Sequence, residues 1–141
     1  MSRTRLKAVC VVRRGNELLL IDTHAPHDEN FRVCVPVGGG INFGEHSKDA
    51  AVRETLEEIS AVVINLKLLM VIENMFSYAG TDYHEIIFAY EGDFEDESLY
   101  QKEQIQGIES TGQEFVCSWI DIDLIKSEEI AFFPTQLIEV L

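Results

Sequence analysis

The chain has 141 residues, of which 46% are hydrophobic and 26% are charged, so we expect one domain, residues 1–141, with its own buried core. Its formal net charge of −14 argues against nucleic acid as a partner, because surfaces that follow phosphates need clustered lysine and arginine. No apolar run approaches the roughly 18 residues of a membrane span, and we expect neither a targeting segment nor a membrane partner.

The first part of the chain predicts three strands, over residues 6–13, 17–22 and 31–37, because apolar and beta-branched residues gather there between turn-forming segments. Residues 24–30 are polar and contain a proline, which predicts a loop. The third strand leads directly into three glycines, Gly38 to Gly40. Such a run indicates either a flexible turn or a close approach of the backbone to a ligand.

The segment after these glycines predicts a helix with one apolar and one acidic face. At about 100° per residue the side chains sort into two groups. The apolar group is Val52, Leu56 and Ile59, and the acidic group is Glu54, Glu57 and Glu58. Like charges at this spacing repel by roughly 0.2–0.5 kcal/mol per pair. A solvated acidic face is one interpretation; a bound hard cation such as Mg²⁺ or Mn²⁺, which prefers oxygen ligands, is the other.

The glycines and the helix together fit one long pattern, Gly-x5-Glu-x7-Arg-Glu-U-x-Glu-Glu-x-Gly-U, where U is a bulky aliphatic residue. The matching positions are Gly39, Glu45, Arg53, Glu54, Glu57 and Glu58. This is the Nudix box, and the chain resembles the Nudix hydrolase family, including its MutT-like members. Thr55, Ser60 and Ala61 depart from the pattern. Ser60 stands where the pattern has a glycine, which often adopts the left-handed conformation. A residue other than glycine in that conformation costs about 1 kcal/mol.

The resemblance implies an α/β (α+β) fold, the Nudix α/β/α sandwich with a mixed β-sheet. It also implies a pyrophosphohydrolase that uses Mg²⁺ or Mn²⁺ to cleave a phosphoanhydride in a nucleoside diphosphate linked to another group. ADP-ribose, a nucleotide sugar and a nucleoside triphosphate all remain open as substrates, and a homodimer would be compatible with the family. The alternative is a non-catalytic nucleotide-binding or sensing module on the same fold.

The resemblance also implies roles for individual residues. The metal ligands would be the Gly38 carbonyl and the carboxylates Glu54, Glu57 and Glu58. Arg53 would orient these carboxylates, and Glu45 would pair with Arg53 or add a metal contact. In the family the general base often comes from a glutamate on a later loop, and both Glu109 and Glu114 are candidates here.

The second part of the chain continues the pattern of strands and connections. We expect strands over 61–76 (two strands broken near 66–68), 83–90 and 114–120, exposed connections over 91–104 and 105–113, and a helix over 134–141. Substrate contacts are harder to assign. Candidates are Arg32 for a phosphate, Phe76 and Tyr78 for stacking on a base, and His84 at a strand entrance.

The three cysteines, Cys10, Cys34 and Cys117, each lie in an apolar run and show no metal-ligand spacing. Their odd number cannot pair completely. We therefore expect buried reduced thiols and a cytoplasmic location.

Overall fold

The computed structural model describes residues 3–141, which form nine strands, two α-helices and two short 3₁₀-helices. In chain order these are β1 (Thr4–Arg14), β2 (Glu17–Ala25), β3 (Asp28–Val35), β4 (Val37–Gly40), α1 (Ser47–Ile59), β5 (Val63–Tyr78), β6 (Thr81–Phe94), η1 (Glu97–Gln101), β7 (Gln104–Ile108), β8 (Glu114–Asp121), α2 (Ile122–Lys126), β9 (Ala131–Phe132) and η2 (Thr135–Val140). None of the helices in this part of the chain is both long enough and apolar enough to cross a membrane.

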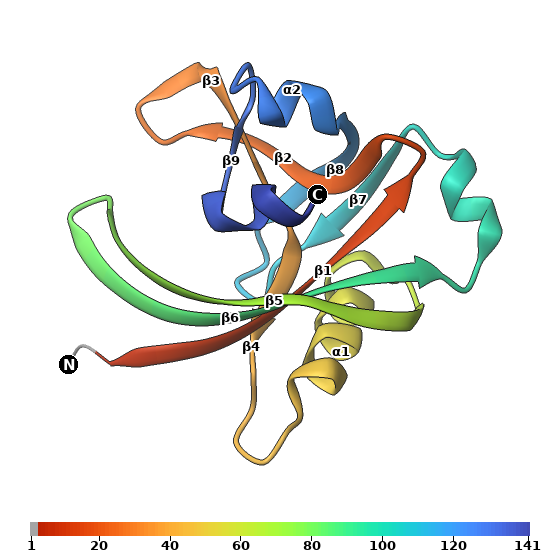
Figure 1. The fold of residues 1–141 in the computed structure, drawn as a ribbon, viewed down its shortest axis with the longest axis horizontal. Helices are drawn as coiled ribbons and strands as arrows, with labels where there is room; N and C mark the ends of the chain where they lie inside the picture. The colour runs from red at the N-terminus through yellow and green to blue at the C-terminus, as the bar shows by residue number, and fades with distance from the viewer. Residues whose placement is uncertain (1–2) are drawn as a thin grey trace.

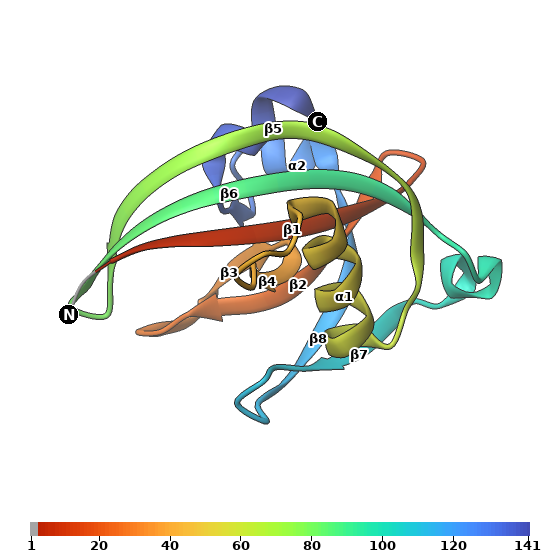
Figure 2. The ribbon, with the colours of Figure 1, turned by 90° about the horizontal axis from the view of Figure 1, so that it is seen from below.

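Strand β1 connects the two halves of the β-structure. It pairs antiparallel with β4 and β2 and parallel with β6. One half has the strand order β5–β6–β1–β4, and the other has the order β7–β8–β2–β3–β9, with a second parallel pair between β3 and β9. Figure 2 shows β5, β6 and β1 as long arched strands, with α1 crossing one face of them.

Helices cover the β-structure on two sides. Helix α1 contributes Ala50, Ala51 and Ile59 to one buried cluster, whereas α2 and η2 contribute Ile125 and Leu137 to a second. In Figure 1, α1 lies on the opposite side of the strands from α2 and η2. The predicted sandwich of helices around a mixed sheet is therefore confirmed.

Two of the predicted boundaries in the second part of the chain are wrong. Residues 61–76 contain one strand rather than two, because β5 bends through register shifts, between Ile64 and Lys67 and between Leu68 and Met70, instead of breaking. Residues 105–113 are not all loop, since β7 pairs with β8. In β7 only Ile105 is fully buried, so its apolar pattern is too short to indicate a strand.

Two further boundaries also differ from the prediction. The loop expected over 24–30 is a tight hairpin, because β2 and β3 pair as far as Ala25 and Asp28. The terminal helix is the short 3₁₀-helix η2 rather than an α-helix. Both differences leave the position of α1 and the glycine run unchanged.

The cysteines are free and buried, as predicted. Removal from water raises the pKa of the Cys10, Cys34 and Cys117 thiols to about 12 each. All three are therefore protonated near neutral pH, and a protonated thiol is a poor nucleophile.

We expect a thiol reagent such as Ellman's reagent to modify none of the three cysteines in the folded protein at about pH 8, because reaction requires an accessible thiolate. After unfolding in guanidinium chloride all three should react. Fast modification of one thiol in the folded protein would contradict the buried positions of these side chains.

Candidate active site

Helix α1 packs on the core through small residues together with part of the predicted apolar group. Ala51, Thr55 and Ile59, spaced four residues apart, are buried, whereas Leu56 is 48% exposed. Of the predicted apolar group, Ile59 is buried and Val52 packs partly against the same core, whereas Leu56 does not. Thr55 can take the buried place because its hydroxyl donates a hydrogen bond of 2.8 Å to the Ala51 carbonyl.

The end of α1 shows why the box pattern has a glycine at position 60. Ser60 adopts the left-handed conformation, with φ 55° and ψ 33°, and its N–H donates to the Leu56 carbonyl over 3.0 Å. Ala61 is buried directly after it. The carboxylates of α1 thus keep their predicted places although Ser60 is strained.

We expect Ser60→Gly to raise the free energy of unfolding by about 1 kcal/mol, because glycine adopts this conformation without a steric penalty. The change should appear as a rise of a few degrees in Tm with unchanged activity. Ser127→Gly provides a matched control, since Ser127 ends helix α2 in the right-handed conformation. If Ser60→Gly were as destabilising as this control, the left-handed assignment would be wrong.

Arg53 is the centre of a hydrogen-bond network on the acidic face. Its guanidinium donates two hydrogen bonds to Glu45 (2.8 and 3.0 Å), one to Glu54 (2.9 Å), one to Glu57 (3.1 Å) and one to the Gly40 carbonyl (2.9 Å). A planar guanidinium suits several fixed acceptors better than an ammonium does. Arg53 thus contacts the carboxylates that the family resemblance implies it would orient.

Glu45 is held on two sides. Arg53 and the backbone N–H of Asn42 together lower the pKa of its carboxyl group to about 2. The same contact with Glu45 raises the pKa of Arg53 above its usual value. Glu45 is therefore a permanently charged partner that fixes the arginine.

Two of the three glycines of β4 stand where a side chain would not fit. A Cβ on Gly39 would lie 2.5 Å from a carboxylate oxygen of Glu54, and one on Gly38 would lie 2.2 Å from the Ala8 carbonyl oxygen. Gly40, in contrast, has open space around its Cα. The backbone of β4 thus approaches the acidic face of α1 at Gly39 and the neighbouring strand β1 at Gly38, so the glycine run is part of a paired strand rather than a flexible turn.

A cavity of about 350 Å³ opens between these glycines and the acidic face. Its lining residues are Arg5, Lys7, Gly38, Gly39, Gly40, Glu54, Glu57, Glu58, Ile108, Glu109 and Ser110. Of the two candidate bases, only Glu109 lines it. Glu114 pairs with Ile108 in the β7–β8 ladder and does not line the cavity.

Glu58 has an unusual environment in this cavity. Its Oε1 atom is buried and has no hydrogen-bond partner among residues 3–141. Burial, with the nearby charges of Glu54 and Glu109, raises the pKa of its carboxyl group to about 7, although Lys7 and the backbone of Gly38 oppose the shift. An orphaned carboxylate oxygen among other carboxylates fits a divalent cation.

The carboxylates that could bind a metal ion line the same cavity, but their side chains do not point to one common position. Within residues 3–141, no three His, Cys, Asp or Glu side chains are placed so that they could hold a metal ion together. Arg53 holds Glu54 and Glu57 by the hydrogen bonds described above. The carboxylates that line the cavity therefore suit a hard cation by their chemistry, whereas their side chains are not gathered around one position.

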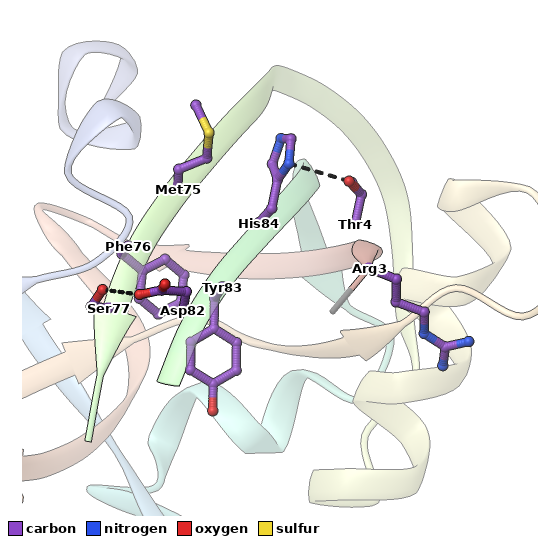
Figure 3. A pocket seen from close by; sticks show the side chains of 8 residues that line it. All are labelled: Arg3, Thr4, Met75, Phe76, Ser77, Asp82, Tyr83 and His84. Carbon is purple, nitrogen blue, oxygen red and sulfur yellow. Dashed lines mark hydrogen bonds between the residues drawn. The ribbon is translucent and has the colours of Figure 1, made fainter. Parts of the chain in front are cut away.

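A second, more open cavity of about 560 Å³ lies at the end of the β5–β6 hairpin (Figure 3). Phe76 and Tyr83 stack there with ring centroids 5.0 Å apart, and His84 hydrogen-bonds Thr4 through Nδ1 over 3.2 Å. The predicted residues Phe76 and His84 both line this cavity. Thr4 lines this second cavity and Lys7 lines the first; both belong to β1, three residues or about 10 Å apart along the strand.

The other two predicted substrate contacts lie outside both cavities. Arg32 is paired with Asp22 through hydrogen bonds of 2.8 and 2.6 Å. Tyr78 is exposed at the hairpin tip. Two cavity residues, Arg5 and Lys7, are absent from the prediction, although basic residues alternating along the first strand were a visible signal.

The site thus consists of a glycine strand that faces a helix of carboxylates held by one arginine, and the comparisons with known proteins show the family. The family model described as the NUDIX domain matches residues 3–140. The chain belongs to the Nudix family and is a Nudix pyrophosphohydrolase. Members of this family generally use divalent cations and act on small nucleotide-derived substrates.

Solved structures share the fold. A MutT Nudix hydrolase from Burkholderia pseudomallei has a TM-score of 0.65 and 21% identity, with 86% of each chain covered. A Nudix hydrolase from Nitrosomonas europaea has a TM-score of 0.62 and 19% identity, covering 97% of this chain and 87% of that one. A mutator MutT protein from Bacillus halodurans has a TM-score of 0.59 and 16% identity, covering 94% and 77%.

Proposed function

We propose that this protein hydrolyses a phosphoanhydride bond in a nucleoside diphosphate linked to another group, with Mg²⁺ or Mn²⁺ as cofactor. The observation that carries the proposal is the gathering of Glu54, Glu57, Glu58 and Glu109 in one cavity beside the glycine strand, with a buried Glu58 oxygen that has no partner. Three free, buried thiols also favour a reducing compartment such as the cytoplasm.

The cation would be held by Glu54, Glu57 and Glu58 together with the Gly38 carbonyl. A divalent cation bound there stabilises the negative charge that develops on phosphate oxygens. The protein contributes a fixed arrangement of ligands. Arg53 is the positioning residue, because it contacts two of the carboxylates and is itself held by Glu45.

Glu109 is our candidate for the general base that takes a proton from the attacking water. It reaches the cavity from the loop after β7, whereas Glu114 does not line the cavity. At the other end of the site, Phe76 and His84 line the second cavity and would contact the nucleoside or the group attached to it.

The first experiment is a panel of compounds assayed for release of phosphate or nucleotide with Mg²⁺, with Mn²⁺ and with EDTA. The panel contains ADP-ribose, NADH, nucleotide sugars, diadenosine polyphosphates and both ordinary and oxidised nucleoside triphosphates. We expect metal-dependent turnover of one compound well above the others. Metal-dependent binding without any turnover would instead favour the sensing module.

The choice of base is tested by a matched pair of substitutions. We expect Glu109→Gln to lower kcat by about 100-fold or more, within the usual range for loss of a general base, because glutamine cannot accept the proton. Glu114→Gln makes the same chemical change at a position outside the cavity and should leave kcat nearly unchanged. A larger loss at Glu114 would reverse the assignment.

A further inference from the structure

The cavity contains two basic residues that the proposed hydrolysis does not yet use. Arg5 and Lys7 project from β1 into the cavity whose carboxylates come from α1 and from the loop after β7. Both are paired with Glu85 of β6, a buried carboxylate that is only 4% exposed. Two cations and one anion leave this group with one net positive charge beside a strongly acidic site.

The pairing with Glu85 is loose. The distances are 3.9 Å from Arg5 and 3.7 Å from Lys7, longer than the 2.7–3.2 Å or so of an N–H···O hydrogen bond. Other arginines of the chain are bound much more tightly: Arg14 and Arg32 approach Glu17 and Asp22 to 2.8 and 2.6 Å. Glu85 thus holds the two cations in place by charge without occupying their hydrogen-bond donors.

The strand beside these cations gives them access to the carboxylates. Lys7 lies opposite Gly40 in the β1–β4 ladder, and Val9 lies opposite Gly38. Glycines carry no side chain that could separate β1 from the acidic face of α1. Lys7 is also close enough to Glu58 to lower the pKa of its carboxyl group against the effect of burial.

We propose that Arg5 and Lys7 form a cationic clamp, anchored by Glu85, that binds a second phosphate of the substrate while the first lies at the carboxylates. A chain with a net charge of −14 repels a polyanion. A purely structural pair would neutralise Glu85 with one close cation, whereas here two cations face the cavity with unused donors.

The clamp deepens the proposed function and rests on it for the position of the first phosphate. It assigns to Arg5 and Lys7 the phosphate of the anhydride that does not lie at the carboxylates. The nucleoside or other group would then continue along β1 toward the second cavity.

The test is calorimetric titration with α,β-methylene-ADP in the presence of Mg²⁺, because this analogue has two phosphates and a bridge that cannot be hydrolysed. We expect Lys7→Met and Arg5→Met each to weaken binding by about 10-fold or more, the usual loss for a charged hydrogen bond. Lys7→Arg, which keeps the charge, should bind within about threefold of wild type.

Lys67→Met is the matched control, because Lys67 lies on β5 outside both cavities and its removal makes the same change in net charge. It should bind the analogue like wild type. Thermal unfolding checks that each variant is folded; Arg5 has a half-exposed side chain, so Arg5→Met keeps the test valid even if Lys7→Met does not fold.

The outcomes separate the clamp from hydrolysis. The clamp is overturned if Arg5→Met and Lys7→Met bind the analogue as wild type does, if Lys67→Met weakens binding equally, or if wild type does not bind it. If both clamp variants hydrolyse a compound of the panel with the KM of wild type, the proposed hydrolysis is supported and the clamp is contradicted. If binding of the analogue depends on Lys7 but no compound of the panel is hydrolysed, the clamp is supported and the proposed hydrolysis is contradicted.

Discussion

Replacing Gly39 with alanine is expected to lower kcat/KM by about 100-fold while leaving the free energy of unfolding nearly unchanged. The added Cβ would lie 2.5 Å from a carboxylate oxygen of Glu54. That carboxylate is the end of a flexible side chain, so it can move aside without disturbing the backbone. A displacement of about 1 Å in a catalytic group is enough for a loss of this size.

Gly40→Ala and Gly38→Ala are matched controls in the same strand. A Cβ on Gly40 meets nothing within 4 Å, so this variant should keep its stability and leave Glu54 in place. A Cβ on Gly38 meets the backbone of β1 at 2.2 Å, so this variant should lose stability as well. Steady-state kinetics and thermal unfolding together distinguish the three variants. If Gly39→Ala were fully active, the observed position of the Glu54 carboxylate would not be required for activity.

Glu58→Gln is expected to abolish most activity, with kcat reduced by about 1000-fold, equivalent to about 4 kcal/mol of lost transition-state stabilisation. Glutamine keeps the volume of the side chain but loses the charge that a cation requires. Glu57→Gln should also remove most activity. Glu103→Gln, at an exposed position outside the cavity, is the control and should behave as wild type.

Glu58→Gln should raise the stability of the metal-free protein although it lowers the activity. Burial raises the pKa of the Glu58 carboxyl group from about 4.5 to about 7 in the folded protein. The folded state therefore holds a proton more strongly than the unfolded state, and stability falls as pH rises between these values. In EDTA at about pH 8, Glu58→Gln should melt at a higher temperature than wild type; a lower Tm would contradict the strained carboxylate.

The parts of the site that lie within one stretch of sequence were predictable. Helical periodicity places Glu54, Glu57 and Glu58 together, and the box pattern supplies Arg53 and Glu45 at the correct spacing. The structure brings Arg53 into contact with three of these carboxylates. These contacts require only that residues 38–60 adopt a glycine strand and a helix.

The remaining parts depend on pairing between distant strands. The choice between Glu109 and Glu114 follows from the β7–β8 register, in which Glu114 pairs with Ile108. Arg5 and Lys7 reach the site because β1 pairs with β4, where Lys7 lies opposite Gly40, a residue more than 30 positions later in the sequence. Helical periodicity grouped Leu56 with Val52 and Ile59, whereas the buried place belongs to Thr55. The sequence gives no signal for this, because the Thr55 hydroxyl is satisfied within its own helix.

The most direct test of the account is a titration of the protein with Mn²⁺, followed by the electron paramagnetic resonance signal of the free ion. Wild type should bind Mn²⁺ without any substrate, and Glu58→Gln should bind it at least about 10-fold more weakly, as expected when a charged ligand is lost. Glu103→Gln should bind as wild type does. Equal binding by wild type and Glu58→Gln would contradict the assignment of this cavity as the metal site.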